Sequence, residues 1–166
     1  MAFHNLTQTD LHSLLDYDQD TGVFTWKKSI GAAKQGKVAG YLCNKHVQIR
    51  LYKKLHYAHR LAWLYVYGYE PKDIDHINGN PIDNRIINLR SVDHTTNMQN
   101  IRKARSDNVC GFLGVETIIR KTTKTKYRAT IIVHGKRIEL GKFDNPVDAH
   151  NKYIEAKRKL HDGCTI

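Results

Sequence analysis

The chain has 166 residues, of which 40% are hydrophobic and 9% aromatic, and its formal net charge is +11 at pH 7. This length can hold one ordinary domain or two small ones, and it contains no apolar run long enough to cross a membrane. The positive charge predicts a polyanionic partner, and it is uneven, because residues 101–166 carry 15 Lys/Arg against 7 Asp/Glu.

The cysteines and the N-terminus favour a cytoplasmic protein. Cys43, Cys110 and Cys164 are far apart and odd in number, so they indicate neither a disulfide framework nor a zinc site. Reduced thiols in a cytosol are the simple interpretation. The first residues, Met-Ala-Phe-His-Asn, do not have the pattern of a signal peptide.

The first 68 residues predict small elements that surround a core. Leucine spacing predicts a short helix over residues 5–17, capped by Thr7 or Thr9. Alternation then predicts strands at 23–26, 47–51 and 55–58, followed by an apolar helix at 59–67 that ends at Gly68. The lysine-rich segment 27–46 suits a loop along a phosphate backbone and a solvated loop equally well. The role of His59 stays open.

The polar stretch from residue 75 to residue 97 has little apolar mass. Asp75 and His76 end a short strand, residues 78–81 have turn chemistry, and residues 85–90 indicate a second short strand. A helix capped by Ser91 or Asp93 then runs through Asn97 and Asn100. Strand, loop, strand and helix in this order would bring Asp75, His76 and Asn97 together.

These side chains suggest hydrolysis of a phosphodiester. Asp75 and Asn97 offer a carboxylate and an amide oxygen, which are hard donors suited to Mg²⁺ or Mn²⁺ and not to zinc. His76 can take a proton from an attacking water at physiological pH. A single cation with one general base is a minimal arrangement for this reaction.

The segment DHINGNPIDNRIINLR contains Asp75-His76 and Asn88, and Asn97 follows it. Together they resemble the HNH motif of phage and intron-encoded homing endonucleases. The resemblance implies that His76 is the general base, that Asp75 and Asn97 bind Mg²⁺ (or Mn²⁺), and that Asn88 pins the loop and orients His76. Asn97 stands where many members have a second His. We further expect Arg85 and Arg90 to hold the DNA strand through phosphate contacts.

The C-terminal part predicts three strands, at 114–119, 126–133 and 136–141, and a helix that Asn145-Pro146 opens. The inward face of the helix is predicted to carry Val147, Ala149 (or His150), Tyr153, Ala156 and Leu160. The helix would cover one face of the sheet and leave the other to contact DNA. The predicted DNA-contacting residues on that free face are Arg120, Lys126, Arg128, Thr130, Arg137 and Glu139, with Glu116 beside them.

This segment resembles the DNA-binding domain of plant ethylene-response factors (Apetala type), which also occurs in phage homing nucleases. The resemblance is carried by Gly114-Val115, residues 127–131, residues 140–143 and the helix with Ala149, Tyr153 and Ala156. It implies binding to double-stranded DNA. Glu139 replaces the tryptophan that commonly stacks on DNA in the plant domains, so no target sequence is carried over.

The sequence therefore predicts an α+β protein with a ββα-metal (HNH) nuclease module at 1–104, a linker at 105–109 and a DNA-binding module at 110–166. We expect a homing-type DNA endonuclease, cytoplasmic in a bacterial host if phage-encoded, without membrane association. The alternative is a DNA-binding regulator whose nuclease module is silent. Removal of residues 107–166 is expected to leave residual nicking, and the oligomeric state is left open.

Overall fold

The structure, a computed structural model, describes residues 6–120 and 123–165, and for residues 120 and 123–125 it describes the backbone alone. Contacts within the chain divide it into two units, Met1–Asp93 and His94–Ile166, each with its own hydrophobic core. The sequence groups residues 94–104 with the nuclease module. The functional boundary at residue 104 therefore stays a prediction.

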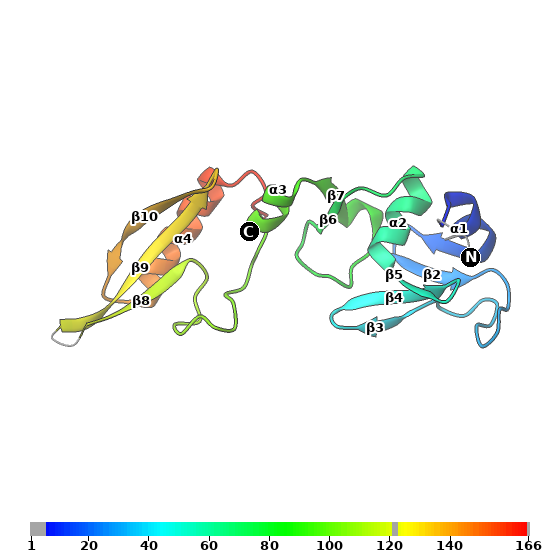
Figure 1. Cartoon of the computed structure of the whole chain (residues 1–166), viewed down its shortest axis with the longest axis horizontal. Helices are drawn as coiled ribbons and strands as arrows, with labels where there is room; N and C mark the ends of the chain where they lie inside the picture. Colours follow the sequence, from blue (N-terminus) through cyan, green and yellow to red (C-terminus); the bar gives the residue numbers. More distant parts are fainter. Residues whose placement is uncertain (1–5, 121–122, 166) are drawn as a thin grey trace. The chain divides into compact units, whose positions relative to one another are not determined.

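Among its described residues, the first unit combines small antiparallel sheets with two α-helices (Figure 1). β1 pairs with β2, β4 lies between β3 and β5, and β6 pairs with β7. The elements in chain order are α1 (Gln8–Leu14), β1 (Leu15–Asp18), β2 (Val23–Trp26), β3 (Tyr41–Cys43), β4 (His46–Leu51), β5 (Lys54–Tyr57), α2 (Ala58–Tyr67), β6 (Asp73–His76), the 3-10 turn η1 (Ile86–Asn88) and β7 (Leu89–Val92).

Local signals set the ends of both helices. Thr7 caps α1 as predicted, since its hydroxyl accepts from the Asp10 N–H while the Asp10 carboxylate accepts from the Thr7 N–H at 3.0 Å. The predicted helix was too long at its C-terminal end, because Leu15 is already extended and begins β1. α2 ends at Gly68, which takes the left-handed conformation with φ 77°.

The core of the first unit joins the helices to the sheets. Burial of these side chains contributes about 1.5–3 kcal/mol for each large apolar residue. Ile74 and Leu89 belong to this core, so β6 and β7 are anchored beside the polar stretch. The buried apolar residues are Leu11, Leu14, Leu15, Tyr17, Phe24, Ala39, Ile49, Leu51, Ala58, Leu61, Ala62, Trp63, Leu64, Ile74 and Leu89.

The strand predicted at residues 85–90 was wrong in its first half. Ile86–Asn88 forms the 3-10 turn η1, in which the N–H of Asn88 donates to the carbonyl of Arg85 at 2.9 Å. Asn88 turns inward to bond the preceding loop, which removes it from strand pairing. β7 therefore begins at Leu89, and Ile87 is left 80% exposed.

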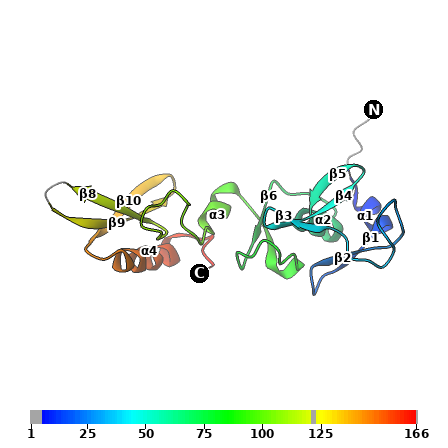
Figure 2. The ribbon, with the colours of Figure 1, turned by 90° about the horizontal axis from the view of Figure 1, so that it is seen from below.

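The second unit contains a three-stranded antiparallel sheet in the order β10–β9–β8, and α4 lies along one of its faces (Figures 1 and 2). The predicted strands and the His134-Gly135 turn are confirmed, although β9 and β10 are longer than expected. The bounds are α3 (His94–Gln99), β8 (Val115–Arg120), β9 (Thr123–Val133), β10 (Lys136–Phe143) and α4 (Pro146–Leu160).

The inward face of α4 differs from the prediction at its two ends. Val147 and Leu160 are 45% and 42% exposed. Lys157 is instead buried, and its ammonium donates to the carbonyl of Ile101. The buried apolar residues of the second unit are Val115, Ala129, Ile131, Ala149, Tyr153 and Ala156.

Asn145 caps α4, since its side chain accepts from the Val147 N–H at 2.9 Å. α3 ends at Gln99, so the predicted helix, which was expected to run through Asn100, is one residue too long at this end. None of the described helices is long and apolar enough to span a membrane. Cys43, Cys110 and Cys164 are free thiols.

Candidate functional site

Asp75 and His76 lie at the end of β6, with only 7% and 8% of each residue exposed. Antiparallel pairing with β7 places Asp75 opposite Arg90 and His76 opposite Leu89. The polar groups are therefore fixed by a core strand and are not carried on a free loop. Such an anchored position is what a reacting group requires.

The carboxylate of Asp75 accepts two hydrogen bonds from one arginine. Arg90 donates through Nε at 3.0 Å and through Nη2 at 2.7 Å to Oδ2 of Asp75. The charge of this buried carboxylate is thus compensated by a guanidinium that is itself one-quarter exposed. Arg90 was expected to contact phosphate, and in this structure it contacts Asp75.

The side chain of Asn84 contacts the ring of His76 at Nε2. Its side-chain N–H donates to the carbonyl of Ile82 at 3.3 Å, so its Oδ1 faces Nε2 of His76, also at 3.3 Å. This contact favours the tautomer that carries its proton on Nε2 and its lone pair on Nδ1. Asn84 is only 3% exposed, which keeps water from competing for this contact.

Two further imidazoles surround His76. The ring of His59 meets that of His76 edge-on at 5.1 Å between centroids, and His46 lies 5.5 Å from His59 and 6.2 Å from His76. Burial, together with the nearby His76 and His46, lowers the pKa of His59 to about 3. Nδ1 of His59 has no hydrogen-bond partner among the described residues. His59, whose role the sequence left open, therefore packs as a neutral ring against His76.

Burial also lowers the pKa of His76 below its usual value. The hydrogen bond to Asn84 and the charge of Asp75 act in the opposite direction, and His46 acts with burial. The net direction favours the neutral imidazole at physiological pH. A neutral imidazole is the form that can accept a proton.

Asn88 bridges the two sides of the loop between β6 and β7. Its Oδ1 accepts from the N–H of Asn78 at 3.0 Å, and its Nδ2 donates to the carbonyl of Asp83 at 2.8 Å. Its own carbonyl accepts from the N–H of Ile77 at 2.8 Å. The side chain that contacts the ring of His76 is that of Asn84. Asn88 therefore orders the loop, whereas Asn84 contacts the imidazole.

Arg85 is held by its neighbour Asp83. Its Nε and Nη2 donate to the two oxygens of that carboxylate at 2.8 and 2.6 Å. Hydrogen bonds from Arg85, with further ones from Asn78 and the backbone, lower the pKa of Asp83 to about 2. The guanidinium of Arg85 remains substantially exposed at the edge of the loop.

Asn97 lies on α3 in the second unit and is partly exposed. Because Asp75 belongs to the first unit, the pairing of Asp75 with Asn97 stays a prediction. Within the described parts of the chain, no three His, Cys, Asp or Glu side chains form a group that could hold a metal ion. The predicted metal ligands, Asp75 and Asn97, are one carboxylate and one amide. A pair of this kind does not count as a group of three His, Cys, Asp or Glu side chains.

On the sheet of the second unit, the predicted arginines form a network with carboxylates. Arg128 pairs with Glu116 at 2.6 Å and approaches Glu139 at 3.8 Å, and Arg137 pairs with Glu116 at 2.8 Å. All four side chains are at least one-third exposed. Glu116 therefore orders the two arginines on the face that α4 leaves uncovered.

The remaining predicted DNA contacts are less closely linked. Lys126 forms an exposed ion pair with Asp144. Thr130 lies opposite Glu139 on the neighbouring strand. The side chain of Arg120 lies outside the described part of the structure.

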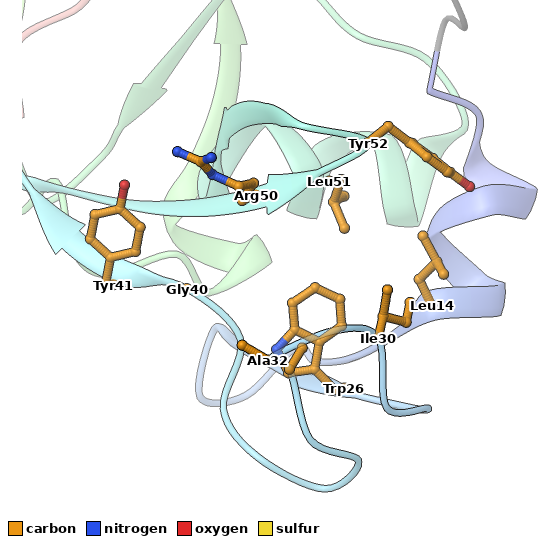
Figure 3. Close-up of a pocket in the computed structure, with 10 residues that line it drawn as sticks. Leu14, Trp26, Ile30, Ala32, Gly40, Tyr41, Arg50, Leu51 and Tyr52 are labelled. Carbon is orange, nitrogen blue, oxygen red and sulfur yellow. The ribbon is translucent and has the colours of Figure 1, made fainter.

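A cavity of about 370 Å³ lies elsewhere in the first unit (Figure 3). The ring of Trp26 lies beside it, together with Leu14, Ile30 and Leu51. Its walls are mainly apolar, and they do not include His76 or the other residues predicted for the site. The chemistry that the sequence indicates is therefore located at the β6–β7 loop and not in this cavity.

Sequence reasoning missed two neighbours of His76, Asn84 and His46, and left the role of a third, His59, open. Asn84 stands within the quoted motif, but nothing in its spacing indicates that it contacts His76. His59 and His46 come from α2 and β4, and only the fold brings them to the ring of His76.

Residues 56–99 match a family model described as HNH endonuclease. The matched range contains His59, Asp75, His76, Asn84, Asn88 and Asn97. This match supports a nuclease domain in that part of the chain, and it does not extend to the β8–β10 sheet. The comparisons with curated proteins and with solved structures gave no match.

Proposed function

We propose that the chain is a metal-dependent DNA endonuclease of the HNH homing type, which hydrolyses phosphodiester bonds at a preferred site in double-stranded DNA. The observation that carries the proposal is the arrangement of Asp75 and His76 at the end of β6, inside the HNH match, with Asn84 on Nε2 of His76.

In this proposal His76 is the general base. With the proton on Nε2, the tautomer that the contact with Asn84 favours, the lone pair on Nδ1 takes the proton from an attacking water. The ring is held by Asn84 on one side and by His59 on another, which limits its rotation. A positioned base of this kind contributes about 10²–10⁴-fold to the rate.

Asp75 and Asn97 are the proposed ligands of Mg²⁺ (or Mn²⁺). The donor set fits such an ion, because it offers one carboxylate and one amide oxygen and no thiolate. Arg90 already bonds Oδ2 of Asp75, so an ion would have to share or displace that contact. When bound, a divalent cation supplies electrostatic stabilisation to the pentacovalent phosphate and the leaving 3′ oxygen.

DNA is the proposed substrate because of the charge and the sheet of the second unit. Residues 101–166 carry 15 Lys/Arg against 7 Asp/Glu, and the uncovered sheet face presents Arg128 and Arg137. An antiparallel ribbon can enter the major groove, where arginine recognises guanine. Arg85 is exposed at the edge of the loop between β6 and β7, where it is suited to contact a phosphate.

Supercoiled plasmid incubated with the pure protein and Mg²⁺ or Mn²⁺ tests the proposal. We expect nicked or linear product with the parent chain, and a rate about 10²–10⁴-fold lower for His76→Ala at equal DNA binding. His56→Ala, a histidine of β5 outside the imidazole cluster, should cut like the parent. If no product forms with either metal across a pH series, the chain is a DNA-binding regulator and the proposal is wrong.

A further inference from the structure

The β1–β2 hairpin contacts the loop between β6 and β7 through the side chain of a buried tyrosine. Tyr17 lies on β1 and is 8% exposed, and its hydroxyl donates to the backbone carbonyl of Asn84 at 2.5 Å. Burial raises the pKa of Tyr17, so the hydroxyl keeps its proton and acts as a donor. Sixty-seven positions separate the two residues along the chain.

The same hairpin touches the same backbone at a second point. Gly22 takes a φ of +73°, and a Cβ built on it would lie 2.5 Å from the backbone N of Arg85 and 2.6 Å from the carbonyl carbon of Asn84. Only glycine permits both the backbone conformation and this close approach. Tyr17 and Gly22 therefore hold the Asn84-Arg85 peptide from the two sides of one turn.

The contact between Asn84 and His76, which the hairpin supports, is sensitive to small shifts of the Asn84 backbone. Oδ1 of Asn84 lies 3.3 Å from Nε2 of His76, which is at the long end of a hydrogen bond. A shift of the Asn84 backbone by a few tenths of an ångström away from the ring would break it. Without that acceptor, the tautomer with its proton on Nε2 loses the hydrogen bond that stabilises it.

We infer that the β1–β2 hairpin is a positioning element of the nuclease, in which Tyr17 and Gly22 act through Asn84 to fix the tautomer and orientation of His76. The inference rests on the proposed role of His76 as general base. It extends the functional module beyond residues 56–99, since the hairpin lies outside the matched range. Tyr17 is a positioning residue and does not touch the reacting atoms.

Packing and positioning by Tyr17 can be separated. Its ring stacks on Phe24 at 4.6 Å and meets Tyr65 edge-on at 5.7 Å, and both contacts survive in Tyr17→Phe. That variant removes the hydroxyl alone. Tyr52→Phe is the control, because it also removes a tyrosine hydroxyl, one that bonds Asp10 on α1 at 3.5 Å.

The first readout is spectroscopic. Nitrogen-15 NMR of the metal-free full chain distinguishes the Nε2–H from the Nδ1–H imidazole. We expect His76 to be mainly the Nε2–H tautomer in the parent and in Tyr52→Phe. Tyr17→Phe and Gly22→Ala should both populate the other tautomer. An unchanged His76 signal in Tyr17→Phe and Gly22→Ala would overturn the inference.

The second readout is a double-mutant cycle on single-turnover cleavage of plasmid DNA. Tyr17→Phe should slow cleavage about tenfold at unchanged DNA affinity, since a misplaced group costs up to about 10² in rate. In an Asn84→Ala background the same substitution should have no further effect. A tenfold loss that persists there would mean that Tyr17 acts by general stabilisation, which contradicts the inference.

The two readouts separate this inference from the proposed function. If the parent chain does not cut DNA, the proposed function fails, while the NMR arm still decides whether the hairpin fixes His76. If the parent cuts and neither readout responds to Tyr17→Phe, the positioning role fails and the nuclease assignment stands.

Discussion

The two residues predicted to flank the reacting phosphate are supported in different ways. His76 ends a core strand of the first unit and is surrounded by buried groups. Asn97 lies on a helix of six residues in the second unit, none of them buried. The proposed base is therefore pre-organised by a hydrophobic core, whereas the proposed metal ligand depends on a few local contacts.

Those local contacts come from the C-terminal segment of the same unit. The N–H of Gly163 donates to Oε1 of Gln99 at 2.9 Å, and the hydroxyl of Thr165 donates to the side chain of buried Asn100. Arg102 in turn donates to the carbonyl of Thr165 at 2.8 Å. Removal of residues 107–166 would take this support away, so residual nicking by the truncated chain is no longer expected.

Loss of Asn88 should have the largest effect on stability, and that effect falls on the first unit, which contains His76. Asn88→Ala leaves the N–H of Asn78 and the carbonyl of Asp83 without their partner. We expect the first unit to lose about 2 kcal/mol of stability, since an unsatisfied buried group costs about 1–3 kcal/mol and these two groups are only partly buried. Hydrogen exchange of the β6–β7 loop, measured on the full chain, checks this. Asn80→Ala is the control, because its side-chain bond to the Ile82 N–H is exposed. Equal exchange in both variants would contradict the bridging role of Asn88.

A smaller and different loss is expected when α3 is displaced. A Cβ on Gly163 would lie 2.3 Å from the carbonyl oxygen of Thr96, the residue before Asn97. Gly163→Ala should therefore raise the Mn²⁺ concentration needed for half-maximal cleavage about tenfold, which corresponds to about 1.4 kcal/mol. Mn²⁺ binding followed by electron paramagnetic resonance should shift in parallel, while DNA affinity stays the same.

Asp162→Ala, a change at the exposed neighbouring position, serves as the control and should bind Mn²⁺ like the parent. If Gly163→Ala also leaves Mn²⁺ binding and cleavage unchanged, α3 is not held by the C-terminal segment in the way described. High Mn²⁺ should restore cleavage in Gly163→Ala, because the ligand is displaced and not removed.

The sequence predicted the parts of the fold that local chemistry specifies. Thr7, Gly68 and Asn145 set helix ends through their own side chain or backbone freedom, and the alternation of Ile49 and Leu51 indicated a half-buried strand. The residues of the HNH motif could likewise be named, since their order along the chain is what the motif records.

Contacts between distant segments could not be predicted in the same way. The bond from Tyr17 to Asn84 joins residues 67 positions apart, and neither has a pattern that names the other. Lys157 was missed for a similar reason, because a lysine on a helix predicts exposure unless a partner such as the carbonyl of Ile101 is known. In both cases the contact depends on tertiary packing and not on local propensity.

The smallest expected effect concerns the sheet of the second unit, where Glu116 ties down Arg128 and Arg137. Glu116→Gln would free Arg137, leave Arg128 with its longer approach to Glu139 at 3.8 Å, and remove one negative charge from the face. We expect binding to a random DNA duplex to strengthen about threefold, within the 0.2–1 kcal/mol that exposed ion pairs contribute. Its dependence on salt should steepen by about one unit of slope as another phosphate contact forms.

Glu155→Gln separates the position of the charge from its amount. Glu155 lies on α4, where it pairs with Lys152 and Lys159, so the variant changes the net charge equally but away from the sheet face. Fluorescence anisotropy over a salt series should show the steeper slope for Glu116→Gln alone. Equal slopes for the two variants would mean that overall charge, and not the sheet arginines, governs DNA affinity. The second unit would then attract DNA without orienting it, and site preference would have to come from the first unit.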